Sequence, residues 1–225
     1  GKIKVLDEEL INKIAAGEVV ERPASVIKEL VENAIDAGAT SIMISVREGG
    51  ISYIKVEDNG LGMDQSDALL ALQRHATSKI STAKYLFLIQ TLGFRGEALA
   101  SIAAVSRLSM QTKEKDAELG YLIEADGGIV THAKECACPS GTTIAIKEIF
   151  FNTPARKKHL KAIATEFRYI VDIVTRYALS YNGITFTLYH NDKRILNAPA
   201  THDSFARVLT IYGMEVADKL IPVDY

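Results

Sequence analysis

The chain has 225 residues, with 26 Lys or Arg against 28 Asp or Glu, so its formal net charge is −2. Its content of 48% hydrophobic and 24% charged residues is typical of a soluble globular protein. The near-neutral charge argues against a protein that coats DNA with its whole surface. No apolar run approaches the length of a membrane span, and two cysteines (Cys136 and Cys138) without a His cluster argue against zinc and favour reduced thiols.

A short helix is predicted near 8–15, followed by a longer helix that begins at Pro23 and ends before Gly38. Proline suits the first turn of a helix, and glycine suits the position after its last turn. At 100° per residue the apolar side chains of the longer helix share one broad arc. These are Val26, Ile27, Leu30, Val31, Ala34 and Ile35. We therefore expect this helix to bury one side.

The polar side of the same helix carries a carboxylate, an amide and a second carboxylate. Glu29, Asn33 and Asp36 lie within about 60° of one another on the helical wheel. Lys28 and Glu32 lie off that arc and are expected to be ordinary solvated positions. Because a solvated face is the usual interpretation of such a stripe, the helix alone does not establish a site.

Two strands are predicted over 41–48 and 51–58, turned by Gly49-Gly50. In the second strand, Asp58 has the same parity as Ile54 and Val56 and is therefore expected on the buried face.

A carboxylate at the end of a buried face needs a hydrogen-bond donor, and Asp58 has no obvious one among its neighbours in the sequence. The exocyclic amine of adenine would be such a donor. Gly60 and Gly62 are expected to let the backbone turn and a ring approach closely. A plain Asp-Asn-Gly turn is the simpler alternative, and it is favoured when the motif is considered by itself.

Groups suited to phosphate follow a helix predicted over 64–73. Thr77, Ser78 and Lys79 offer two hydroxyls and an ammonium, and the segment 93–96 (Gly-Phe-Arg-Gly) precedes a helix predicted over 97–105. Backbone N–H groups at a helix start bind anions. Neither GxxxxGK[ST] nor GxGxxG occurs, which excludes the P-loop and Rossmann nucleotide sites.

The rest of the chain alternates strands and helices. Strands are predicted near 106–113, 119–125, 129–134, 142–148 and 184–190, helices near 154–161 and 165–180. A linker is predicted around 199–204, then a helix over 204–212 and a strand over 219–223.

A local excess of positive charge lies between 154 and 176. Six basic residues (Arg156, Lys157, Lys158, Lys161, Arg168 and Arg176) stand against Glu166 and Asp172. Such a patch could contact DNA phosphates without reading sequence, with Arg156, Lys157, Lys158 and Lys161 as the candidates. A solvated basic helix face explains the pattern equally well.

Several strings in the same order resemble the MutL family of DNA mismatch-repair proteins, within the GHKL superfamily of ATPases. They are residues 14–23 (IAAGEVVERP), 74–79 (RHATSK), 93–102 (GFRGEALASI) and 151–157 (FNTPARK). Residues 29–33, 58–62, 93–99 and 141–143 match the four ATP-site motifs of the superfamily. The resemblance covers nearly the whole chain.

The resemblance implies a role for each matching residue. Glu29 would be the general base for the attacking water, Asn33 would bind Mg²⁺, and Asp58 would bind the adenine amine. Ala37, Gly62 and Met63 would line the base pocket, and Thr143 would close it near Asp58. The triphosphate would be covered by Thr77, Ser78, Lys79, Gly93, Phe94, Arg95, Gly96, Ala98 and Leu99.

The resemblance also implies an α/β fold. Residues 1–200 would form a GHKL-type (Bergerat) sandwich of a mixed, mainly antiparallel sheet and a helical layer. Residues 201–225 would be a linker and the beginning of a truncated second α/β domain, ribosomal-S5-like, whose lysine for the γ-phosphate lies beyond this chain, so we expect the chain to be a fragment.

The expected activity is slow, Mg²⁺-dependent ATP hydrolysis coupled to dimerisation through roughly residues 2–20, as a homodimer or related heterodimer. Expected partners are double- or single-stranded DNA and a mismatch-recognition protein of the MutS type, in the cytoplasm or a eukaryotic nucleus. A clamp of this kind would signal between mismatch recognition and strand removal. The alternatives are another GHKL ATPase (a type II topoisomerase subunit, a sensor kinase or an Hsp90-like chaperone) and an ATP-sensing DNA-binding scaffold with negligible turnover.

Overall fold

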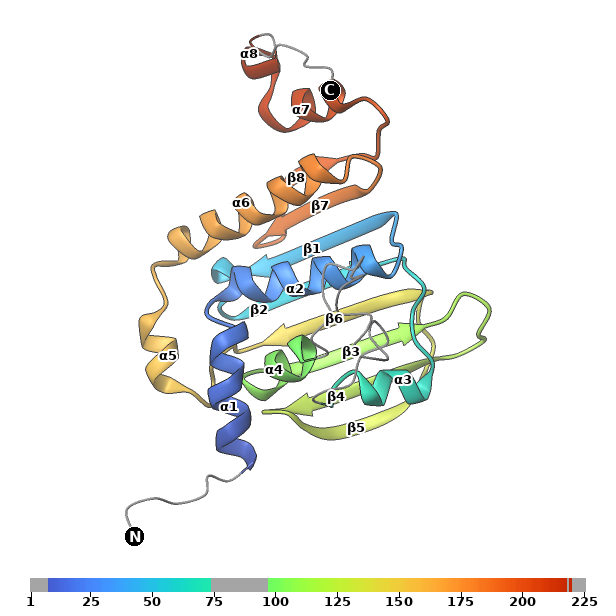
Figure 1. Ribbon diagram of the computed structural model, residues 1–225, viewed down its shortest axis with the longest axis vertical. Coiled ribbons are helices and arrows are strands. Elements are labelled where there is room, and N and C mark those ends of the chain that lie inside the picture. Colours follow the sequence, from blue (N-terminus) through green and yellow to red (C-terminus); the bar gives the residue numbers. More distant parts are fainter. Residues whose placement is uncertain (1–7, 74–96, 218, 220–225) are drawn as a thin grey trace, which may run out of the picture.

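The computed structural model describes residues 8–73, 97–217 and 219. Eight strands form one sheet in the order β5-β4-β3-β6-β2-β1-β7-β8, and helices cover one of its faces (Figure 1). Among the described strands only β1 and β7 pair in parallel. The predicted α/β sandwich with a mixed, mainly antiparallel sheet is confirmed.

The strands are β1 (Ser41–Arg47), β2 (Tyr53–Asp58), β3 (Arg107–Lys113), β4 (Gly120–Asp126), β5 (Ile129–Cys136), β6 (Gly141–Lys147), β7 (Thr185–His190) and β8 (Lys193–Ala198). The helices are α1 (Glu8–Val19), α2 (Pro23–Asp36), α3 (Gln65–Leu70), α4 (Ala98–Ala104), α5 (Pro154–His159), α6 (Ile163–Ser180), α7 (Ser204–Tyr212) and α8 (Met214–Ala217). A 3₁₀ turn, η1 (Glu48–Gly50), joins β1 to β2.

The core lies between the sheet and its helical layer. The apolar arc predicted for α2 is buried from Val26 to Ala34, and α6 buries Ile170, Val174 and Ala178, which are spaced one helical turn apart. On the sheet, Ile42, Ile44, Ile54 and Val56 alternate toward these helices, as expected for strands buried on one face. Burial of this apolar surface is the main force that holds α2 and α6 on the sheet.

The edge strand β8 was not predicted from the sequence. Most of its side chains are exposed, so it lacks the alternation of a half-buried strand. It pairs antiparallel with β7 across Asn191 and Asp192, whose φ angles are +49° and +64°. Asn-Asp between two short β-rich runs is a hairpin signal that the sequence does contain. The strand predicted over 219–223 lies almost entirely outside the described residues.

The helix predicted over 204–212 is confirmed as α7, and one arginine joins it to the sheet. Arg207 is 1% exposed and donates hydrogen bonds to the carbonyls of Ala198, Asn182 and Ile184 at 3.1, 2.6 and 2.8 Å. A buried guanidinium needs such acceptors. None of the described helices is long and apolar enough to cross a lipid bilayer.

Candidate nucleotide site

Helix α2 places Glu29, Asn33 and Asp36 on its partly buried side. The Glu29 side chain is 22% exposed, and its Oε1 lies 3.5 Å from the ammonium of Lys28. Asn33 and Asp36 are also half-buried. The polar arc of α2 is thus partly buried rather than a fully solvated helix face.

Glu32 corrects one expectation from the sequence. It was expected to be solvated, but its side chain is only 10% exposed. Its carboxylate accepts a hydrogen bond from the Tyr177 hydroxyl at 2.5 Å and contacts Lys28 at 3.1 Å. Tyr177 comes from α6, which packs against α2, so tertiary packing buries a position that the helical pattern alone predicted to be solvated.

Asp58 ends β2 on the face that carries the buried Ile54 and Val56, as predicted by parity. The structure supplies donors that the sequence did not reveal, because the Gly60 N–H donates to Asp58 Oδ1 at 2.8 Å. Burial raises the pKa of the Asp58 carboxyl, and hydrogen bonds from the Gly60 and Thr142 backbone lower it only in part. The carboxylate is therefore incompletely stabilised and gains from a further donor.

Strand register places Thr142, and not Thr143, beside Asp58. In the β2–β6 pair Asp58 lies opposite Thr142, whereas Thr143 lies opposite Glu57. Because successive side chains of a strand point to opposite faces, Thr143 points to the face without helices. The Thr142 hydroxyl is instead 3.0 Å from that of Thr112 on β3. The predicted placement of Thr143 in the base pocket is therefore wrong, by one residue.

The loop after Asp58 is packed against protein on two sides. A Cβ on Gly62, whose φ is +71°, would lie 2.0 Å from the carbonyl oxygen of Lys113. Gly62 thus allows the loop to approach the backbone of β3 closely. The sequence had predicted that this glycine makes room for a ligand ring. Next to it, the Met63 N–H donates to Thr112 Oγ1 at 2.9 Å, and the Met63 side chain packs on the core.

This loop also joins β2 to the end of α2. The Leu61 N–H donates to the Ala37 carbonyl at 3.0 Å, so the Asp58 loop lies against the C-terminal end of the helix. Glu29 lies eight positions earlier, about 12 Å along the helix axis. The carboxylates of Asp58 and Glu29 are thus set apart along the direction of α2.

The phosphate-binding candidates lie largely outside the described residues. This applies to Thr77, Ser78, Lys79, Gly93, Phe94, Arg95 and Gly96. Ala98 and Leu99 are described, and they begin α4 with Ala98 half-buried and Leu99 buried.

The described residues can bind Mg²⁺ only together with a nucleotide, whose phosphates would supply the other ligands. They contain no cluster of three or more His, Cys, Asp or Glu side chains that could cage a metal. Mg²⁺ in phosphate-transfer sites needs no such cage, because one or two side-chain oxygens join phosphate oxygens and waters around it. Asn33, one turn after Glu29, can supply such an oxygen.

Of the four candidates for DNA contact, one side chain is packed against the protein and three are exposed. A Cβ on Gly17 of α1 would meet the Arg156 guanidinium at 1.7 Å, so Arg156 lies against that helix. Lys157, Lys158 and Lys161 are exposed. Glu166 is buried and accepts from the Lys161 N–H at 2.8 Å, so it does not offset this charge at the surface.

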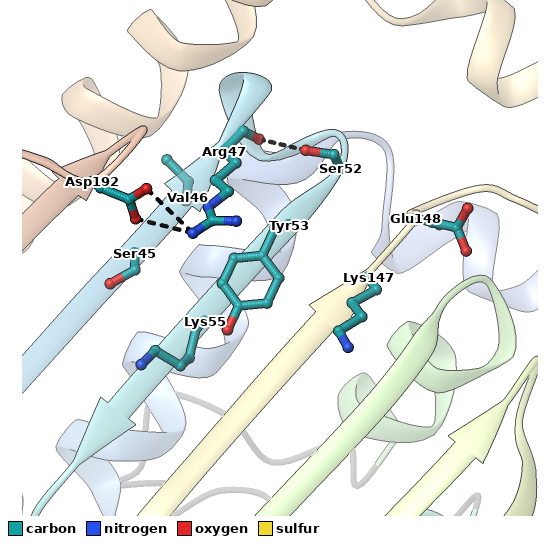
Figure 2. Close-up of a pocket in the computed structure, with 9 residues that line it drawn as sticks. All are labelled: Ser45, Val46, Arg47, Ser52, Tyr53, Lys55, Lys147, Glu148 and Asp192. Carbon is teal, nitrogen blue, oxygen red and sulfur yellow. Dashed lines mark hydrogen bonds and ion pairs between the residues drawn. The ribbon is translucent and has the colours of Figure 1, made fainter.

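A separate hollow of about 530 Å³ lies over β1, β2 and the end of β6, away from α2. Figure 2 shows Arg47 lying between Asp192 and Tyr53, with Lys55 and Lys147 nearby. Arg47 pairs with Asp192 at 3.1 Å and Lys55 pairs with Glu57 at 2.8 Å, so Arg47 and Lys55 each already have an anionic partner. None of the predicted nucleotide-binding residues that the structure describes lines this hollow.

Residues 21–138 match the family model of histidine kinase-, DNA gyrase B- and HSP90-like ATPases. The chain belongs to this ATPase family. The matched region contains α2 and the Asp58 loop, which are the two parts of the candidate site, and it ends just before β6.

Within the family, the chain is similar to DNA mismatch-repair proteins. The chain is 52% identical to the DNA mismatch repair protein MutL of Caldanaerobacter subterraneus over 98% of this chain. It is 51% identical to that of Symbiobacterium thermophilum over 100% of this chain. These alignments cover 37% and 35% of the relatives, so the chain spans little more than a third of their length. The predicted membership of the MutL ATPase group is confirmed.

Solved structures agree with this assignment. The Aquifex aeolicus MutL ATPase domain complexed with ADP superposes with a TM-score of 0.69 at 28% identity, over 86% of this chain and 70% of that one. The N-terminal domain of a DNA repair protein superposes with a TM-score of 0.79 at 29% identity, over 93% of this chain and 62% of that one.

Proposed function

We propose that this chain binds ATP between α2 and the Asp58 loop and hydrolyses it slowly with Mg²⁺. The observation that carries the proposal is the placement of the half-buried Glu29 on α2 and of Asp58 before a loop that lies against the C-terminal end of that helix, in a chain of this ATPase family. The related Aquifex aeolicus domain, which is described as complexed with ADP, supports the choice of an adenine nucleotide.

In this site each residue has one role. Asp58 accepts the hydrogen bond of the adenine amine, and Thr142, beside it on β6, takes the place first given to Thr143. Asn33 holds Mg²⁺, which supplies positive charge to the phosphate oxygens. Glu29 accepts a proton from the attacking water. Ala37, Gly62 and Met63 line the base, and Thr77, Ser78, Lys79, residues 93–96, Ala98 and Leu99 cover the triphosphate.

ATP binding would couple to dimerisation and so act as a clamp signal between mismatch recognition by a MutS-type protein and strand removal. Two apolar side chains of α1, Ile11 and Ile14, are 41% and 51% exposed, which suits a helix that packs against a second copy. We further propose that residues 201–225 open a second domain, with Arg207 as its fixed connection to β8 and to the turn that precedes β7.

The test is ATP hydrolysis and light scattering on the full-length protein. We expect slow phosphate release with Mg²⁺ and none with EDTA. A dimer should form with a non-hydrolysable ATP analogue and dissociate when the nucleotide is removed. Nucleotide binding without any turnover would favour the ATP-sensing scaffold instead, and a mass independent of nucleotide would remove the clamp.

Sequence-independent DNA binding would use the exposed lysines around α5. Each phosphate neutralised by a lysine contributes about 0.9 to the slope of log affinity against log salt. Lys157→Glu with Lys161→Glu should therefore weaken duplex binding and reduce that slope by about 2. Fluorescence anisotropy over a salt series measures both quantities.

The matched control for the lysine pair reverses two exposed charges on the distant edge strand β8, Lys193→Glu with Arg194→Glu. If both double variants lower the slope equally, general charge explains the effect and the α5 patch is not the binding site.

A further inference from the structure

A row of four polar side chains connects α6 to the proposed base. The Tyr177 hydroxyl donates to Glu32 Oε1 at 2.5 Å, the Lys28 ammonium contacts Glu32 at 3.1 Å, and the same ammonium lies 3.5 Å from Glu29 Oε1. Tyr177 is on α6, and the other three residues are on α2. The row therefore begins in one helix and ends at the carboxylate that faces the site.

Among the three members of the row on α2, Glu32 is the most buried and Lys28 the most exposed, so Glu32 is the fixed one. The Lys28 side chain is 44% exposed and that of Glu32 only 10%. An exposed lysine has a flexible stem, and its ion pair with Glu29 alone would contribute little order. Glu32 fixes the ammonium, and the Tyr177 hydroxyl in turn fixes the Glu32 carboxylate.

The contacts with Glu32 help to keep both of its partners, Lys28 and Tyr177, protonated. Burial by itself would lower the pKa of Lys28, but Glu32 and Glu29 outweigh it and the pKa is raised. The pKa of Tyr177 is raised by burial and then by its bond to Glu32, so the hydroxyl remains a donor. Lys28 and Tyr177 thus remain hydrogen-bond donors across the neutral pH range.

We propose that Tyr177 is a positioning residue for ATP hydrolysis, which acts through Glu32 and Lys28 to hold the Glu29 carboxylate by its Oε1. This rests on the proposed role of Glu29 as the base. A base must be held within a fraction of an ångström of its productive position, and a displacement far from the chemistry lowers the rate. Anchoring Oε1 leaves the other carboxylate oxygen for the water.

Tyr177→Phe in the full-length protein tests the proposal. The ring keeps its packing, while Glu32 loses one donor and Lys28 loses its fixed neighbour. We expect kcat for ATP hydrolysis to fall about three- to tenfold, with KM and ATP affinity unchanged. A purely structural hydroxyl would lower the melting temperature and leave kcat of the folded protein at the wild-type value, which would overturn the proposal.

The matched control is Tyr181→Phe, which removes the hydroxyl of the neighbouring ring, whose centroid lies 6.3 Å from that of Tyr177. It should keep the wild-type kcat. Lys28→Met should itself lower kcat, and adding Tyr177→Phe to it should lower kcat no further, because both act through one row. Additive effects would show that Tyr177 does not act through Lys28 and would overturn the proposal.

The outcomes also separate this inference from the function on which it rests. A wild-type protein that hydrolyses ATP together with a Tyr177→Phe variant of equal kcat overturns the positioning role alone. A wild-type protein that does not hydrolyse ATP overturns the proposed function and the positioning role with it.

Discussion

Glu29→Ala should bind ATP with wild-type affinity and hydrolyse it at least about 100 times more slowly. A positioned general base contributes about 10²–10⁴-fold to a hydrolysis rate, and Ala cannot accept the proton of the attacking water. Binding should persist because Asp58 and the phosphate-covering segment are untouched. Phosphate release under multiple turnover and equilibrium binding of a fluorescent ATP analogue measure the two quantities separately.

Asp172→Ala is the matched control for this variant, since it removes an exposed carboxylate from α6, the helix that packs beside α2. It should leave both quantities unchanged. Undiminished hydrolysis by Glu29→Ala would remove Glu29 from the base role. If the variant instead lost ATP binding, Glu29 would be holding the nucleotide, and the slower hydrolysis would follow from the lost binding.

Asp58→Ala should lose ATP affinity by about 30- to 100-fold, the cost of one charge-assisted hydrogen bond in a half-buried pocket. The adenine amine would remain without its acceptor, and GTP, which lacks that amine, should bind the wild-type protein as weakly. Calorimetric titration with ATP and with GTP checks both expectations. Equal affinities for ATP in wild type and variant would show that Asp58 only caps its own loop through Gly60.

The raised pKa of Asp58 adds a pH dependence with a defined sign. The folded protein holds this proton more tightly than the unfolded chain does, so ionisation of Asp58 costs stability as pH rises from the ordinary carboxyl range through the raised value. The donor amine of adenine favours the ionised form. ATP affinity should therefore fall as pH drops through the Asp58 pKa, and Asp58→Asn should remove that part of the dependence.

Features that depend only on residues close together in the chain were predicted correctly from the sequence. The apolar arc of α2, the hairpin of β1 and β2, and the parity of Asp58 with Ile54 and Val56 follow from helix and strand periodicity, and all three hold in the structure. The resemblance to mismatch-repair ATPases also needed no coordinates, because the strings that carry it are continuous.

Contacts between distant segments required the tertiary structure. Which threonine of the Gly-Thr-Thr sequence lies beside Asp58 depends on the register between β2 and β6, and a shift of one residue reverses the face. The burial of Glu32 depends on a tyrosine 145 positions away. Local periodicity thus determined the elements, and continuous sequence strings indicated the family of this protein. Strand register and helix packing decided which polar side chains meet, because neither is encoded within a single segment.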